Sequence, residues 1–250
     1  MIDWGDGSGE VALDTLTPTH TYSKAGKYVV KVKGVTGIAQ QHKTGTEILP
    51  QDLLMLKAVE LNSEVTSIGS RGFEYQTALT DISFTSSLLQ IGTYAFNSCS
   101  FLRHIPTMNA NTTLSSGVFR DIHVLDEVNL PANLQTIPSL CFFTDISLQQ
   151  IVIPSTVTQI ETQAFQNCYA LSEVHIQATT PPTLGNSALY NLSSDFIIYV
   201  PVGTGDTYKA AAGWSAYADH ILEEGQTPNR AMLSRLAVSD SSNTDESNER

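Results

Sequence analysis

The chain has 250 residues and is poor in cysteine, in charge and in long apolar runs. Its three cysteines, Cys99, Cys141 and Cys168, form no CxxC pair. Because their number is odd, at least one of them is free or paired with another chain. No apolar run approaches the roughly 18 residues that a membrane-spanning helix needs, so no insertion into a bilayer is expected.

Basic residues are especially scarce. The chain has 13 Lys and Arg against 25 Asp and Glu, which gives a formal net charge of -12. A protein that binds a nucleic-acid backbone needs clustered Lys and Arg, and so does one that binds an anionic membrane surface. The composition therefore argues against both partners. Hydrophobic residues still make up 41%, enough for an ordinary globular core.

Catalytic and metal-binding motifs are also missing. The sequence contains no G-x-S-x-G, H-E-x-x-H or P-loop, and its six histidines are scattered as lone surface residues. No Cys or His pair has zinc spacing. Asp3, Asp6 and Glu10 miss the calcium-loop spacing and are expected to be turn carboxylates, and Glu223 and Glu224 are expected to be solvated. We therefore predict no enzyme activity, no cofactor and no metal site.

An internal repeat dominates the chain. One column of phenylalanines recurs at steps of 23 residues, and four more apolar columns keep the same step without an insertion. Such a register predicts a repeat architecture. The columns are Phe73, Phe96, Phe119, Phe142 and Phe165; Ile68, Ile91, Leu114, Ile137 and Ile160; Leu79, Leu102, Leu125, Leu148 and Leu171; Ile82, Ile105, Val128, Ile151 and Val174; and Phe84, Thr107, Leu130, Ile153 and Ile176.

Each copy ends in an L-x-x-V-x-I spacing, as at Leu171, Val174 and Ile176. The last two positions alternate with period two, as in a short strand with one inward face. One copy cannot bury that face, but stacked copies can, with neighbouring strands about 4.8 Å apart. The fold class is therefore a β-rich repeat solenoid over residues 53–182. It has about five coils, a parallel strand ladder, and the phenylalanines in the middle of each coil.

The cysteines occupy interior columns of this repeat. Cys99 and Cys168 share one column three copies apart, about 14 Å, which is too far for a disulfide. Cys141 lies in a column of small residues with Ala95 and Ala164. We predict three buried packing thiols.

Two segments carry a resemblance to a known family. IGTYAFNSCSFLRHI (91–105) and IETQAFQNCYALSEVHI (160–176) resemble the BspA-like class of bacterial leucine-rich repeats, whose motif I-G-x-x-A-F-x-x-C-x-x-L-x-x-I-x-I-P recurs every 23 residues or so. Gln76, Ile122 and Asp145 replace the motif cysteine in the other copies. The resemblance implies a secreted or surface-displayed, non-catalytic protein that binds host matrix proteins or other surface proteins.

The segment that follows the repeats resembles the closing element that commonly ends such solenoids. Residues 183–224 hold an apolar strand at Phe196–Val200 and a short helix at Asp206–Ala212. We expect Trp214, Tyr217 and Ile221 to cover the open end of the last coil. Residues 225–250 are predicted to be a disordered tail, with a short helix around Ala231–Val238 as an alternative.

Residues 1–43 resemble the second half of a PKD-type β-sandwich module, through WGDGSG and HTYSKAGKYVVKVKG. Only three residues precede the WGDG turn, so the module is expected to be incomplete. Lys27–Lys33 alternates as a strand. We predict a β-hairpin remnant packed near the first coil, or a stub with an exposed edge. The first ten residues show neither the basic nor the apolar region of a signal peptide.

The outward strand positions form the candidate binding surface, because they vary while the inward ones do not. A binding face on a fixed scaffold would show this pattern, and so would a neutral solvated face. Residues 65–176 contain eight acidic residues, three Arg and no Lys, so a ligand must tolerate a mildly acidic, amide-rich surface. The candidate ligand-binding residues are His104, Glu127, Asn129, Gln150, Val152, Glu173 and His175.

Two other functions stay open beside protein binding. The first is an architectural spacer within a larger surface or phage-tail protein, a role that suits a PKD-like remnant. The second is a carbohydrate-binding accessory module, which needs an exposed aromatic patch. Trp4, Tyr22 and Tyr28 are the available N-terminal aromatic cluster, and their pattern is typical of a hairpin core.

Overall fold

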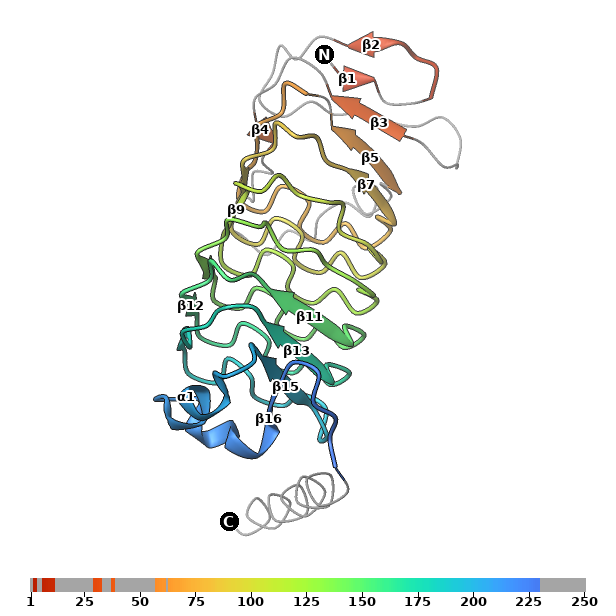
Figure 1. Cartoon of the computed structure of the whole chain (residues 1–250). Helices are drawn as coiled ribbons and strands as arrows, with labels where there is room; N and C mark the ends of the chain where they lie inside the picture. Colours follow the sequence, from red (N-terminus) through yellow and green to blue (C-terminus); the bar gives the residue numbers. More distant parts are fainter. Residues whose placement is uncertain are drawn as a thin grey trace.

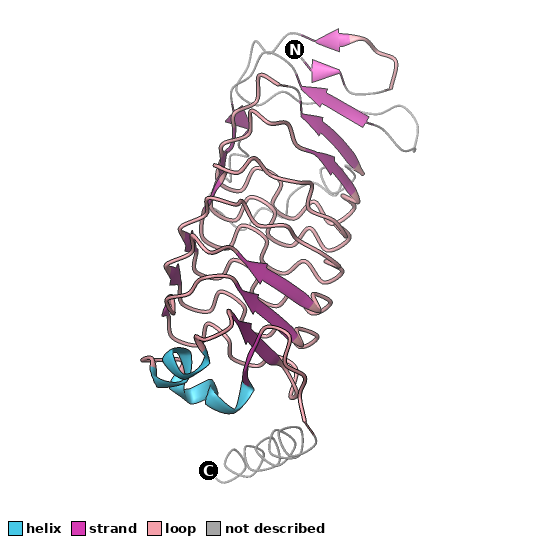
Figure 2. Cartoon of the chain, viewed as in Figure 1, coloured by secondary structure: helices cyan, strands magenta, loops and turns pink. Residues whose placement is uncertain are grey.

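The structure is a computed structural model that describes residues 2–3, 6–11, 29–32, 37–38, 57–61 and 63–229. The repeating part is a stack of coils that runs the length of the molecule (Figure 1). Each turn of the chain adds one position to a parallel sheet on one side and one to a second ladder of short strands. Figure 2 shows that strands and loops make up nearly all of the described chain, with helix confined to the C-terminal end. The predicted solenoid is confirmed.

The sheet runs in two stretches. In both, successive strands pair in parallel, and between the stretches a single bridge joins His104 to Glu127. The first stretch contains β3 (Val29–Val32), β5 (Ala58–Leu61) and β7 (Asp81–Ser83), and the second contains β11 (Gln150–Ile153), β13 (Glu173–Ile176), β15 (Ile197–Val200) and β16 (Ile221–Glu223).

The second ladder consists of seven two-residue strands, which form two separate sheets of four and three strands. The expected count of about five coils is therefore slightly low. The last step of the ladder pairs Gln159 with Thr183, which is one residue longer than the repeat, so a fixed period misses this coil. These strands are β4 (Gly37–Ile38), β6 (Ser67–Ile68), β8 (Gln90–Ile91), β9 (Thr113–Leu114), β10 (Thr136–Ile137), β12 (Gln159–Ile160) and β14 (Thr183–Leu184).

The phenylalanine column forms the centre of the core. Neighbouring rings stack from coil to coil, with centroids 5.2–5.9 Å apart. The residues that flank each ring by two positions adopt left-handed backbone angles, as at Tyr94 (φ 55) and Ser98 (φ 60). As a result the N–H groups of Tyr94, Phe96 and Ser98 all donate to carbonyls of the next coil. Thr107 departs from the apolar columns, because its side chain is exposed.

At the N-terminal end, β1 (Ile2–Asp3) and β2 (Glu10–Val11) form an antiparallel pair, and β1 also pairs with β3. Strand β3 lies within the segment predicted as a strand and pairs in parallel with β5. It therefore extends the solenoid sheet rather than a separate module. Most of residues 1–43, including Trp4, Tyr22 and Tyr28, lies outside the described residues.

The C-terminal end is closed by α1 (Gly205–Ala210), the 3-10 helix η2 (Ser215–His220) and β16. The Tyr208 hydroxyl donates to the Ala178 carbonyl at 2.7 Å, and Trp214 Nε1 donates to the Pro182 carbonyl at 2.7 Å. The helix is shorter than predicted, because Ala211 has an extended backbone. Strand β16 was not predicted. The predicted tail lies outside the described residues from residue 230 onwards.

Candidate functional site

The seven candidate ligand-binding residues lie at outward positions of the sheet side. Gln150 and Val152 on β11 stand directly beside Glu173 and His175 on β13. In the middle coils, His104 and Glu127 are paired with each other through a single β-bridge. Every candidate except the partly buried His175 is exposed. The register thus brings the candidates onto one continuous surface, which we call the sheet face.

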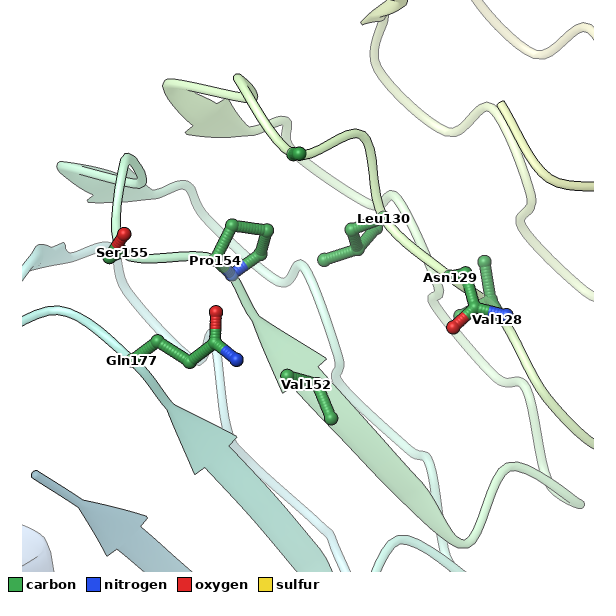
Figure 3. A pocket seen from close by; sticks show the side chains of 8 residues that line it. Val128, Asn129, Leu130, Val152, Pro154, Ser155 and Gln177 are labelled. Atoms are coloured by element: carbon green, nitrogen blue, oxygen red, sulfur yellow. The ribbon is translucent and has the colours of Figure 1, made fainter. Parts of the chain in front are cut away.

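A groove of about 320 Å³ opens at the carboxyl ends of these strands (Figure 3). Two predicted residues, Asn129 and Val152, line it, and Val152 is 47% exposed although it is aliphatic. The sequence prediction missed the other lining residues because Val128 and Leu130 belong to inward columns and the rest follow the strands. They are Val128, Leu130, Ala132, Pro154, Ser155 and Gln177.

His175 is the most highly connected side chain of the sheet face. Its Nδ1 lies 2.9 Å from Glu224 Oε1, its Nε2 lies 3.3 Å from Glu173 Oε2, and its ring stacks on Tyr199 with centroids 4.7 Å apart. Only a protonated imidazole donates at both nitrogens. Partial burial lowers the pKa of His175, but the hydrogen bonds to Glu224 and Glu173 outweigh it, so the pKa is raised. The expectation of a lone surface histidine is wrong here.

Glu224 is exposed, as expected of a solvated carboxylate, and Glu223 is partly exposed, yet both form contacts that the sequence did not predict. Glu224 binds His175, and Glu223 Oε1 accepts a hydrogen bond from the backbone N–H of Gly205 at 2.9 Å. Backbone hydrogen bonds from Gly203 and Gly205 lower the pKa of Glu223. Both residues therefore hold the C-terminal cap in place: Glu223 contacts the start of α1, and Glu224 contacts His175 on the sheet face.

Other charges near the sheet face are mainly acidic. Asn129 Nδ2 donates to Glu127 Oε1 at 3.1 Å, which orients one carboxylate along the surface. Arg103 forms an exposed ion pair with Asp126 at 3.2 Å, so its charge is balanced locally. The sheet face thus combines carboxylates and amides with one exposed aliphatic side chain.

The cysteines supply no reactive group. All three are free and buried, as predicted. Cys99 Sγ donates to the Phe73 carbonyl and Cys168 Sγ to the Phe142 carbonyl. Burial raises the pKa of all three thiols, which removes the thiolate that a nucleophile or a metal ligand requires.

Across the part of the chain that the structure describes, no three His, Cys, Asp or Glu side chains converge to hold a metal ion. Asp6 accepts a hydrogen bond from the Ser8 N–H at 3.0 Å, as a turn carboxylate does. No helix within the described residues is long and apolar enough to cross a membrane.

Comparison with solved structures supports the fold. A leucine rich cell surface protein from Faecalibacterium prausnitzii A2-165 is 24% identical with a TM-score of 0.51, and the match covers 70% of this chain and 50% of that one. A leucine-rich repeat protein from Eubacterium ventriosum ATCC 27560 is 20% identical with a TM-score of 0.51, covering 69% of this chain and 61% of that one. The chain thus spans less than two thirds of either protein. No curated protein sequence matches it.

Comparison with protein families identifies the repeat itself. The BspA type leucine rich repeat region matches residues 51–145 and 135–201, in six copies. The match begins at residue 51, so it gives no support to the PKD-type resemblance of residues 1–43. The matched residues make up more than half of the sequence, and they coincide with the stacked coils. This chain therefore belongs to the BspA-type leucine-rich repeat family.

Proposed function

We propose that this chain is a non-catalytic binding protein that holds a protein partner on its sheet face. The observation that carries the proposal is the register of β11 and β13, which sets Gln150, Val152, Glu173 and His175 side by side on one exposed surface. Repeat solenoids commonly bind partners along such extended faces. Leucine-rich repeat scaffolds are typical of proteins that interact with other proteins.

The groove beside this surface gives the partner a point of attachment. Val152 and Leu130 offer apolar contact, whereas Asn129 and Gln177 offer amide donors and acceptors. A mixture of a few polar groups with an apolar patch is what a protein side chain needs for a specific fit. The fixed hydrogen-bonded ladder beneath keeps these groups in place, so little ordering is required on binding.

We also propose a role for each of the two main segments and a cellular location for the protein. Residues 53–182 present the sheet face, and residues 183–224 close the end of the stack. The similar protein from Faecalibacterium prausnitzii is described as a cell surface protein. We place this chain in the same setting, secreted or displayed on a cell, with host matrix or other surface proteins as partners.

A binding screen of the full chain tests the proposal. Biolayer interferometry would measure binding to extracellular matrix proteins and to a glycan array, for the wild type and a variant with Glu127→Lys, Gln150→Lys and Glu173→Lys. We expect saturable binding of the wild type to a protein. The variant should bind at least tenfold more weakly, because three lysine charges would have to lose their hydration when a partner covers the sheet face.

A control variant carries the same change of charge on exposed positions elsewhere, namely Gln90→Lys, Asp195→Lys and Asp206→Lys. It should bind like the wild type. Equal losses in both variants would contradict the assignment of the sheet face. Binding to glycans alone would favour a carbohydrate-binding module, and no binding by a well-folded chain would favour a spacer.

A further inference from the structure

One interior column of the solenoid supplies hydrogen-bond donors to the phenylalanine turns. All of its members are buried. Where the column holds a cysteine, the S–H donates to the phenylalanine carbonyl 26 positions earlier: Cys99 to Phe73 at 3.1 Å and Cys168 to Phe142 at 3.0 Å. The column consists of Gln76, Cys99, Ile122, Asp145 and Cys168.

The backbone N–H of this column also has a regular partner, the phenylalanine carbonyl of its own coil. Asp145 follows the rule, since its N–H donates to Phe142 at 3.1 Å, and three other members do the same. Ile122 departs from it, because its N–H donates to Asp145 Oδ1 at 2.7 Å instead. The Phe119 carbonyl is thereby left without the N–H donor that the corresponding carbonyls receive.

One carboxylate oxygen of Asp145 has no hydrogen-bond partner in the described part of the chain, at the column position where a cysteine would donate to a phenylalanine carbonyl. Its side chain is fully buried, and no hydrogen bond reaches its Oδ2 from the described residues. Asp145 also stands 26 positions after Phe119, the same offset that places Cys168 against the Phe142 carbonyl. We infer that Asp145 is held as a neutral carboxylic acid whose Oδ2–H donates to the Phe119 carbonyl. Protonation thus gives partners to two buried groups at once, because the same carboxyl accepts from Ile122 and donates to Phe119.

The surroundings of Asp145 favour the neutral form. The titratable groups around it are Cys141 in its own coil, Cys168 in the next coil and Asp121 in the preceding coil. The carboxylate of Asp121 is itself ion-paired with Arg120 at 3.1 Å. Burial raises the pKa of Asp145 well above its usual value, the Ile122 N–H lowers it, and Asp121 raises it further.

This protonation makes the scaffold sensitive to pH. In the unfolded chain an aspartate has a pKa of about 3.9, whereas the folded pKa is raised. Between the two values the folded state binds one proton more, so the stability falls as the pH rises. The loss is up to about tenfold in the folding equilibrium per pH unit, or ~1.4 kcal/mol. The contribution is fully present below the unfolded pKa, and the solenoid is therefore favoured in acidic surroundings.

Two substitutions separate this acid from every other titrating group. Asp145→Asn keeps an acceptor for Ile122 and supplies an N–H₂ donor for Phe119 at every pH. Asp145→Cys restores the residue found at positions 99 and 168 of the same column. Asp195→Asn is the control, because this aspartate is exposed. Urea unfolding of the full chain between pH 4 and pH 9 would measure the stability of each protein.

We expect Asp145→Asn and Asp145→Cys to lose most of the pH dependence, and their stability relative to the wild type to increase as the pH rises above the unfolded aspartate pKa of about 3.9. The control should follow the wild type. The infrared spectrum of the wild type at pH 7 should contain the C=O stretch of one protonated carboxylic acid, which Asp145→Asn removes. Parallel pH profiles of wild type and Asp145→Asn would overturn the inference. So would a wild-type spectrum without the acid band, which needs no variant to fold.

Discussion

The C-terminal stretch of the sheet side and the middle coils that precede it are built on one repeat, yet they differ in how firmly their coils are joined. In the C-terminal stretch β11 and β13 pair over four residues, from Gln150 with Glu173 to Ile153 with Ile176. In the middle coils the ladder shrinks to the single bridge between His104 and Glu127. Figure 1 draws no strand arrow on this side between β7 and β11. The predicted binding residues extend across both parts.

The difference has a cause in two residues of the middle coils. In the C-terminal stretch the residue equivalent to Pro106 is His175, whose N–H lies within the continuous parallel ladder of β13 with β11. The corresponding donor to the Ile82 carbonyl would be the nitrogen of Pro106, which carries no hydrogen. Thr107 next to it is exposed, whereas Ile153 and Ile176 in the same column are buried. The middle strand therefore lacks both a ladder bond and an inward anchor.

The middle coils hold together through the opposite side of the stack. The N–H of Phe119 donates to the Cys141 carbonyl, and the Phe119 ring lies between Phe96 and Phe142 with centroids 5.9 and 5.6 Å away. The phenylalanine column therefore maintains the repeat where the sheet does not. Sheet positions are then free to vary, which is where a binding surface can develop.

The largest expected effect comes from removing a ring of the middle coils. Phe119→Ala should lower the free energy of unfolding by about 3–5 kcal/mol, because it leaves a cavity in the stack. It should also divide urea unfolding into two transitions, since coils in a solenoid contact only their neighbours and the sheet is already interrupted at this point. Circular dichroism would follow the whole chain, and tryptophan fluorescence in a Trp4→Phe background would report on Trp214 in the cap and so follow the C-terminal part separately.

Phe165→Ala is the matched variant in the continuous stretch, because its ring is equally buried. It should lose a similar amount of stability in a single transition, since the neighbouring strands remain paired. Two transitions in both variants, or one in both, would contradict the idea that the middle coils and the C-terminal stretch differ in coupling.

The repeat could be predicted from the sequence because it is a local, periodic signal. The columns through Phe96 and Leu102 fix the coil length, the inward face and the parallel register without any long-range information. The final coil was not predicted because Thr183 follows its partner Gln159 by one residue more than the repeat length. Strand β16 was not predicted because its pairing with β15 depends on the path of the cap and not on a repeat motif.

The candidate site could be predicted only as a surface. Period-two alternation identifies Glu173 and His175 as outward, but it cannot place Glu224, which is 49 residues from His175 along the chain, against the imidazole. The groove likewise depends on how Pro154 and Gln177 leave their strands. The neutral state of Asp145 follows from hydrogen bonds to adjacent coils, which become visible only once the coils are stacked.

A smaller effect should sharpen the comparison by repairing the ladder. Pro106→Val adds the missing N–H and matches Val152 in the same column. The new hydrogen bond and the lost rigidity of proline nearly cancel, so the free energy of unfolding should change by less than about 1 kcal/mol. Hydrogen exchange of residues 104–107 should nevertheless slow towards that of residues 150–153. An unchanged exchange rate would mean that Thr107 and not Pro106 interrupts the ladder. The variant Thr107→Ile would then test this in the same measurement.

The smallest effect concerns the contact between the sheet face and the cap. His175→Gln removes the charge that joins Glu173 on β13 to Glu224 after β16. The His175 pKa is raised in the folded protein, so its stabilisation is fully present below the unfolded pKa of about 6.5 and is lost as the pH rises through the folded value. Because Glu173 and Glu224 are about half exposed and His175 is only partly buried, solvent screening limits the effect to about 0.5 kcal/mol.

Thermal unfolding of wild type and His175→Gln at pH 5.5 and pH 9 would measure this contribution. The two proteins should differ at pH 5.5 and agree at pH 9. The matched variant His104→Gln changes an exposed histidine of the middle coils, which pairs only across the single bridge. It should have no effect at either pH. A loss in His104→Gln equal to that in His175→Gln would mean that the middle coils are coupled as firmly as the C-terminal stretch, against the contrast drawn from the interrupted ladder.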